Sequence, residues 1–169
     1  HPIYPVMGEG KYDIMNTNLP AGFDEFSGTE QFFISIASKC SPNPGDIPIL
    51  KIPFTADRSE LEALGAPDVR LAGFGVFFSG ILILAFFLGL FAIWKSKRTM
   101  SLVPAIAIFG LMALFFPESW WARYNPYTYY IPGLVLLAFS TVPKTELVSY
   151  LMSLLMLVNG VISGSAVYW

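Results

Sequence analysis

Residues 71–94 read LAGFGVFFSGILILAFFLGLFAIW, a run of 24 residues without a charged side chain. A helix that crosses the hydrocarbon core of a bilayer needs about 20 predominantly apolar residues. A soluble domain normally has about 25 % charged residues, whereas only 13 % of this 169-residue chain is charged. The run therefore predicts a membrane-spanning helix.

Three further apolar runs follow, at 99–116, 127–143 and 147–169. The run at 127–143 is the weakest of them, because Pro126 and Pro132 confine regular helix to its later part. Prolines are nevertheless tolerated in membrane helices whose neighbours satisfy the freed carbonyls. The sequence predicts an all-α membrane protein with about four transmembrane helices, or three helices and a re-entrant segment.

Charged residues are unevenly distributed along the chain. Residues 1–70 hold ten acids and five bases, whereas residues 71–169 hold two acids and five bases. Short loops rich in Lys and Arg face the cytoplasm, and WKSKR at 94–98 is such a loop between the first two spans. This orientation predicts that Lys144 is cytoplasmic and that residues 1–70 and the loop at 117–123 are extracytoplasmic.

The polar segment 1–70 is too irregular to predict an independent domain. Turn-forming residues interrupt it, most densely in SPNPGDIP. Apolar residues at helical spacing predict one helix that begins at Ser27 or Thr29 and ends at Ser38, and a second short helix fits 56–64. We expect an irregular, partly helical extracytoplasmic segment that precedes the spans.

Several kinds of site are disfavoured. Cys40 is the single cysteine and His1 the single histidine, which removes an intrachain disulfide and the usual Ser-His and His-metal arrangements. The net charge of −2 argues against nucleic acid as a partner. No charged residue lies in the middle of a span, where transporters hold coupling sites, and Asn159 is predicted to form an interhelical hydrogen bond.

The loop after the second span reads PESWWARYNPYTYY and contains Arg123, the single base of the membrane half on the outer side. A guanidinium offers a planar fork for phosphate oxygens, so an anion site is predicted at this boundary. Its candidate residues are Arg123, Arg70, Trp120, Trp121, Tyr124 and Glu118. Two alternatives remain open. The rings can form an ordinary aromatic belt, and Glu118 can form an exposed ion pair with Arg123 that contributes little.

Acidic residues in or near the outer loops are candidates for a general base or for oxygen ligands of a divalent cation. They are Asp13, Asp24, Glu25 and Asp68. No ligand motif accompanies them, so the sequence predicts no cofactor and no metal. The alternative interpretation is that they are solvated charges at helix ends.

Three short motifs occur in the order HPIYP at 1–5, DVRLAGFGVFFSG at 68–80 and PESWWARYNPYTYYIPG at 117–133. Together they resemble the C-type integral-membrane glycosyltransferases of bacterial cell-envelope polysaccharide assembly, which use polyprenyl-phosphate-linked sugars. The resemblance implies a multi-pass protein of the bacterial cytoplasmic membrane that transfers sugar to an envelope glycan on the outer face. It further implies that Arg123, with Arg70 as a neighbour, stabilises the departing phosphate.

The chain also departs from that family. The family's catalytic acid lies in a first outer loop after a first span, and the family has more spans than four. We therefore expect this chain to be a piece of a longer protein, with a mature N-terminus after signal cleavage as the alternative. The resemblance implies that His1 orients a phosphate or an acceptor hydroxyl. A further departure follows WWARY, where this chain has Asn-Pro-Tyr at 125–127 in place of the family's Pro-Gln pair.

The expected partners are the lipid bilayer, a polyprenyl-phosphate-linked sugar, and the rest of a longer chain or other membrane subunits. A second function is also consistent with the sequence: a non-catalytic membrane scaffold or interaction subunit of a larger complex. The pair Gly160 and Gly164 has the small-xxx-small spacing of close helix contacts, which suits that alternative.

Overall fold

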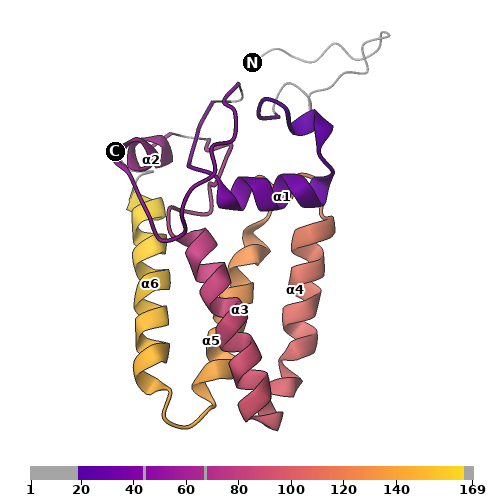
Figure 1. Ribbon diagram of the computed structural model, residues 1–169, viewed down its shortest axis with the longest axis vertical. Helices are drawn as coiled ribbons and strands as arrows, with labels where there is room; N and C mark the ends of the chain where they lie inside the picture. Colours follow the sequence, from indigo (N-terminus) through magenta and orange to yellow (C-terminus); the bar gives the residue numbers. More distant parts are fainter. Residues whose placement is uncertain (1–18, 44, 67, 166–169) are drawn as a thin grey trace.

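Four helices run side by side as a bundle, and each is antiparallel to the next along the chain (Figure 1). They are α3 (Phe78–Lys95), α4 (Val103–Phe115), α5 (Tyr130–Ser140) and α6 (Glu146–Ser165). The computed structural model describes residues 19–43, 45–66 and 68–165, and its regular structure within these ranges is helical throughout. Two isolated bridges, Ser38 with Leu50 and Ser41 with Leu71, are the only β contacts there.

Two shorter helices lie at one end of the bundle, α1 (Gly28–Ala37) and α2 (Arg58–Leu64). Three 3₁₀ turns complete the order: η2 (Phe23–Glu25), η3 (Lys97–Ser101) and η4 (Pro126–Tyr129). We call the described residues from 19 to 70 the cap. In Figure 1, α1 lies across the ends of α3 and α4, and α2 lies beside the end of α6.

Both cap helices begin with a capping box, which explains why the sequence predicts them correctly. In α1 the Ser27 side chain accepts from the Glu30 amide, and the Glu30 carboxylate accepts from the Ser27 amide at 2.8 Å. In α2 the same exchange joins Asp57 and Glu60. Each box satisfies backbone donors that a helix N-terminus leaves unpaired. The helices predicted near 27–38 and 56–64 are therefore confirmed.

Two bundle helices, α3 and α6, are long and apolar enough to cross a membrane. The other two are shorter than the predicted spans at 99–116 and 127–143, because α4 has 13 residues and α5 has 11. At 1.5 Å per residue α3 is about 27 Å long and α5 about 17 Å. Pro126 opens the 3₁₀ turn η4, so regular α-helix starts only at Tyr130, as its prolines predict. The prediction of four full-length spans is thus not confirmed.

Ser35 joins the cap to both loops at this end of the bundle. Its hydroxyl donates to the Trp120 carbonyl at 2.7 Å and accepts from the Ala72 amide at 3.2 Å. Beside it, Phe32 and Ile36 of α1 pack against a core that includes Phe74, Phe78 and Ala113. The loop at 117–123 therefore lies at the same end as the cap, whereas the turn between α3 and α4 and the turn between α5 and α6, to which Lys144 belongs, lie at the opposite end (Figure 1).

The backbone that enters α3 is held by Asn159 of α6. The Asn159 amide accepts from the Phe77 N–H at 3.0 Å and donates to the Phe74 carbonyl at 3.0 Å, and the residue is 1 % exposed. Gly75, with φ +106°, lies against it. Asn159 does form buried hydrogen bonds, but the predicted interhelical bond is not what is found, because its partners lie in the backbone just before α3.

The glycine pair of α6 makes no such contact. A Cβ added at Gly160 or Gly164 would meet no heavy atom within 4 Å among the described residues. Within this part of the chain, the two glycines therefore do not mediate close helix packing.

Candidate functional site

The six residues predicted for the anion site lie at the cap end, in two loops. Arg70 precedes α3, and the other five occupy the turns between α4 and η4. Successive backbone hydrogen bonds, from Trp121 N–H to the Glu118 carbonyl and from Tyr124 N–H to the Trp121 carbonyl, build these turns. Glu118 adopts φ 62°, which reverses the chain where α4 ends.

The two tryptophans belong to the core. Trp120 and Trp121 are 2 % and 4 % exposed, and their rings stack at 5.3 Å. Phe23 packs edge-on against Trp120 at 5.5 Å, and Leu71 completes the cluster. The two rings therefore connect the cap to the loop, and the aromatic-belt interpretation does not fit these two buried tryptophans.

Asp68, Arg70 and Trp121 form a closed cluster. The Trp121 indole N–H donates to Asp68 Oδ1 at 3.1 Å, and Arg70 pairs with Asp68 Oδ2 at 3.2 Å. The Arg70 guanidinium also lies 4.2 Å from the centre of the Trp121 ring. Both carboxylate oxygens of Asp68 are thus engaged, and Arg70 is fixed by its neighbours.

Arg123 lines a cavity of about 470 Å³ where the cap meets the bundle. The wall comes from the end of α2, the segment before α3, the turns before α5 and the end of α6. It consists of Leu64, Ala66, Asp68, Val69, Gly73, Ala122, Arg123, Tyr129 and Ser163. Arg123 is exposed and, among the described residues of this wall, is the one cation. A guanidinium at the mouth of a cavity can bind phosphate or carboxylate oxygens in a bidentate manner.

The remaining predicted residues flank Arg123. Tyr124 is 40 % exposed, and its ring centre is 5.9 Å from the Arg123 guanidinium. No salt bridge joins Glu118 to Arg123, both of which the structure describes. The predicted Glu118–Arg123 ion pair is therefore absent, and Arg123 is not neutralised by that carboxylate.

Two hydroxyl-bearing residues of this cavity, Tyr129 and Ser163, were not predicted as site residues. Tyr129 donates its hydroxyl to the Phe74 carbonyl at 2.6 Å, and Ser163 donates to the Asn159 carbonyl at 2.9 Å. Tyr129 belongs to the aromatic stretch PESWWARYNPYTYY, which the sequence predicts to be a candidate region, although this residue is not among the candidates for the anion site. Ser163 lies in the last apolar run without any local signal, since only the tertiary fold brings the end of α6 to the cap.

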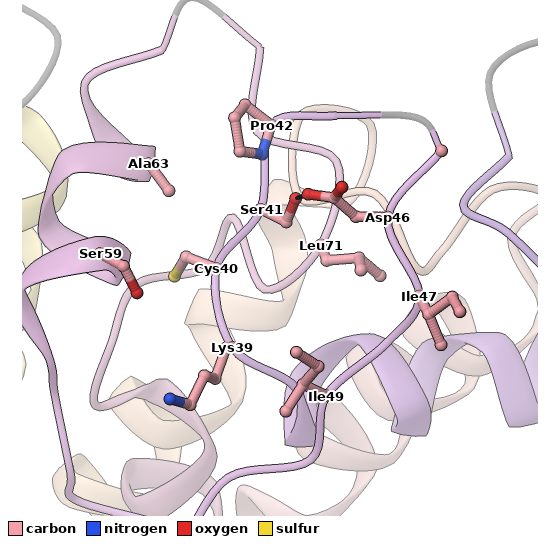
Figure 2. Close-up of a pocket in the computed structure, with 11 residues that line it drawn as sticks. Lys39, Cys40, Ser41, Pro42, Asp46, Ile47, Ile49, Ser59, Ala63 and Leu71 are labelled. Carbon is pink, nitrogen blue, oxygen red and sulfur yellow. Dashed lines mark hydrogen bonds between the residues drawn. The ribbon is translucent and has the colours of Figure 1, made fainter.

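A second cavity, of about 570 Å³, lies within the cap (Figure 2). Its polar groups are already paired: Asp46 accepts from Ser41 and Asn43, and Lys39 pairs with Asp57. The hydrogen bond from Lys39 lowers the pKa of the Asp57 carboxyl. In Figure 2 Lys39 and Asp46 point in different directions, so they form no common site.

Cys40 also lines this second cavity but is not an activated nucleophile. Burial raises the pKa of its thiol to about 12, and the thiol donates to the Ala72 carbonyl at 3.3 Å. Reactive cysteines have thiolates stabilised at neutral pH, which is the opposite arrangement.

The other acids named as candidates, where the structure describes them, do not join the two cavities. Asp24 and Glu25 are exposed in η2 and line neither cavity, whereas His1 and Asp13 lie outside the described residues. In the part of the chain that the structure describes, no three His, Cys, Asp or Glu side chains are grouped to hold a metal ion.

Comparison with known proteins identifies no relative: no protein-family model, no curated protein and no solved structure matches this chain.

Proposed function

We propose that this chain is part of an integral-membrane glycosyltransferase, in which Arg123 binds the phosphate of a polyprenyl-phosphate-linked sugar on the outer face of the bacterial cytoplasmic membrane. The observation that carries the proposal is Arg123 itself, an exposed cation in the wall of a 470 Å³ cavity at one end of an apolar helix bundle. The sugar chemistry rests on the resemblance of the three sequence motifs.

The bundle surface supports a membrane location for all four helices. Large apolar side chains are exposed on each helix, for example Phe86 at 62 % on α3, Phe115 at 75 % on α4, Leu137 at 55 % on α5 and Leu147 at 71 % on α6. Soluble monomers rarely expose continuous apolar surface of this kind. Lipid would remove it from water, and η3 and η4 would complete the crossings of the shorter α4 and α5.

The charges then set the orientation. The α3–α4 and α5–α6 connections lie at the end of the bundle opposite the cap (Figure 1). They hold Lys95, Lys97, Arg98 and Lys144, and bases in short loops favour the cytoplasm. The acidic cap, the Arg123 loop and the cavity would then face outward. This is the side on which polyprenyl-linked donors of envelope glycans are used by the family that the motifs resemble.

Sided cysteine labelling tests this orientation. Ala56→Cys in the cap and Ser101→Cys in η3 both replace exposed residues, and each is made in a Cys40→Ala background of the full-length protein. A membrane-impermeant maleimide is expected to label Ala56→Cys in intact cells and Ser101→Cys only after lysis. Labelling of both positions in intact cells, or the reverse order, would contradict the proposal.

Removal of the Arg123 guanidinium tests the phosphate site. Arg123→Ala in the full-length protein is expected to lower transfer from polyprenyl-phosphate-linked sugar donors in membranes by about 100-fold, the usual effect of losing one donor to a developing anion. Arg123→Lys keeps the charge without the planar fork, and is expected to retain an intermediate rate.

The matched control is Arg58→Ala, because Arg58 is a cap arginine whose side chain is 92 % exposed outside the cavity. Its transfer rate should equal that of the wild type. If Arg123→Ala transfers sugar at the wild-type rate and all variants accumulate equally, Arg123 does not bind the phosphate.

A non-catalytic membrane scaffold is the second candidate, and one observation favours it. Among the described residues of the cavity wall, Asp68 is the sole carboxylate, and both of its oxygens are engaged by Trp121 and Arg70. A transferase needs a general base for the acceptor hydroxyl, which the described cavity wall does not offer. If the wild type transfers no sugar and co-purifies with a defined membrane partner, the scaffold becomes the better assignment.

A further inference from the structure

A groove of about 310 Å³ lies on the side of the bundle between α3, α4 and α5, away from the Arg123 cavity. Its lining is entirely apolar and includes Phe86, Leu90 and Ile93 of α3, Val103 of α4 and Val135 of α5. Gly89 also lines it, and a Cβ there would lie 3.5 Å from Val135. The missing side chain at Gly89 therefore helps to keep the groove open.

One end of the groove adjoins the basic turn. Ile93 is two residues before Lys95 in α3, a rise of about 3 Å, and Val103 begins α4 two residues after η3 ends at Ser101. The three bases between them, Lys95, Lys97 and Arg98, are exposed, and none forms a salt bridge with another residue that the structure describes. One end of the apolar groove therefore lies near three basic side chains, none of which forms a salt bridge with an acid among the described residues.

We propose that this groove binds an acyl chain of an anionic phospholipid whose phosphate is held by Lys95, Lys97 and Arg98. Charge complementarity favours this occupant. An apolar helix from another chain would fill the groove but offer no negative charge to the three basic side chains. An anionic lipid offers an acyl chain for the groove and a phosphate for the bases. Basic clusters beside a membrane helix attract anionic headgroups on the cytoplasmic side. The Lys95 ammonium, 4.0 Å from the Trp94 ring centre, lies beside an aromatic side chain suited to headgroup depth.

The inference rests on the membrane location proposed above, but on neither sugar transfer nor Arg123. A lipid at this end would anchor the cytoplasmic ends of α3, α4 and α5 together, because residues of all three helices line the groove. The site would therefore serve assembly or regulation of the bundle, at the opposite end from the chemistry.

The test is lipid retention by the purified full-length protein in neutral detergent, measured by native mass spectrometry after addition of phosphatidylglycerol or phosphatidylcholine. Wild type is expected to retain phosphatidylglycerol in preference. Joint replacement of Lys95, Lys97 and Arg98 by Gln is expected to weaken that retention by roughly 100-fold, since each base contributes about fivefold, and to leave phosphatidylcholine unchanged.

A second variant tests the groove without altering charge. Gly89→Leu is expected to reduce retention of phosphatidylglycerol at least tenfold, whereas Ala107→Leu, an exposed position of α4 outside the groove, should bind as wild type. Protection of the buried Cys40 thiol shows that each variant is folded at the cap.

Three results would overturn the proposal: equal retention of both lipids by wild type, unchanged binding by the triple glutamine variant, or unchanged binding by Gly89→Leu. If a second copy or another segment of the full-length chain covers the groove, wild type would retain neither lipid, which is one form of equal retention. Transfer activity is not read in this experiment, so its failure is separate from failure of the Arg123 proposal.

Discussion

Glu60→Ala is expected to increase the labelling rate of the Cys40 thiol by about 100-fold to 1,000-fold, because it opens the cap. Lys51 and Glu60 form a salt bridge at 2.6 Å, with side chains only 3 % and 1 % exposed. Loss of one partner of a buried pair leaves an uncompensated charge and destabilises a fold by about 3–5 kcal/mol. Glu60 also accepts from the Cys40 amide at 3.3 Å, so the change directly loosens the segment that buries the thiol.

The reporter needs no engineering, because Cys40 is the single cysteine of the chain. Its pKa of about 12 in the closed cap, together with its burial, makes it unreactive until the cap opens. The measurement is the rate of reaction with excess thiol reagent at constant pH, in detergent micelles and under native conditions.

Glu62→Ala is the matched control, two residues further along α2. It breaks the exposed Arg58–Glu62 pair, whose side chains are 92 % and 66 % exposed. Exposed pairs contribute little, so labelling should rise less than about twofold. Joint replacement of Lys51 by Met and Glu60 by Leu should restore most of the protection, because neither charge remains buried. Equal labelling of Glu60→Ala and Glu62→Ala would show that the buried pair does not hold the cap closed.

Gly75→Ala is expected to separate α6 from the start of α3 and to lower the free energy of unfolding by about 3 kcal/mol or more. Gly75 has φ +106°, where a side chain is strained, and its Cβ would lie 2.5 Å from Ser163 Oγ and 2.6 Å from the Asn159 amide. Strained backbone costs about 1–3 kcal/mol and overpacking about as much again. The displaced Asn159 would also lose its two buried hydrogen bonds.

Reversible unfolding in mixed detergent and SDS micelles, followed by tryptophan fluorescence, measures this effect. Gly110→Ala in α4 is the control, because a Cβ there meets nothing within 4 Å and the helix gains an alanine. It should be neutral or slightly stabilising. In a double-mutant cycle, Asn159→Ala should relieve part of the Gly75→Ala clash, so the two effects should be less than additive. If the effects of Gly75→Ala and Asn159→Ala on the free energy of unfolding are additive, the alanine at position 75 does not clash with Asn159.

Local signals in the sequence predicted the local parts of the fold well. The helices predicted to begin at Ser27 or Thr29 and near residue 56 do form, with Ser27 and Asp57 as their N-terminal caps. Each of the four apolar runs overlaps a bundle helix, but only α3 and α6 are long and apolar enough to cross a membrane, so the prediction of four spans is not confirmed. Part of the run at 99–116 forms the 3₁₀ turn η3, and part of 127–143 forms η4, because prolines and turn residues limit regular helix there.

The candidate site was predicted only in part, because long-range contacts decide which of its residues are accessible. Trp121 donates to Asp68 across 53 positions of sequence, and Tyr129 donates to Phe74 across 55. No local pattern encodes such pairs, so the sequence could nominate Trp120 and Trp121 for a ligand without revealing that the cap buries them. Arg123 differs: its exposure and its place in a cavity wall keep the predicted anion site open to test.

The hydrogen bond from the Ser35 hydroxyl to the Trp120 carbonyl joins residues 85 positions apart, so it cannot form until the ribosome has added Trp120. A ribosome that adds about 5–20 residues per second needs roughly 4–17 s to proceed from one to the other. During that interval Phe23, Leu71 and the inner face of α1 lack the two tryptophans that complete their core. In the orientation proposed above, the cap would therefore stay open on the outer side, and in need of protection from proteases and premature association, until α3 and α4 have been inserted.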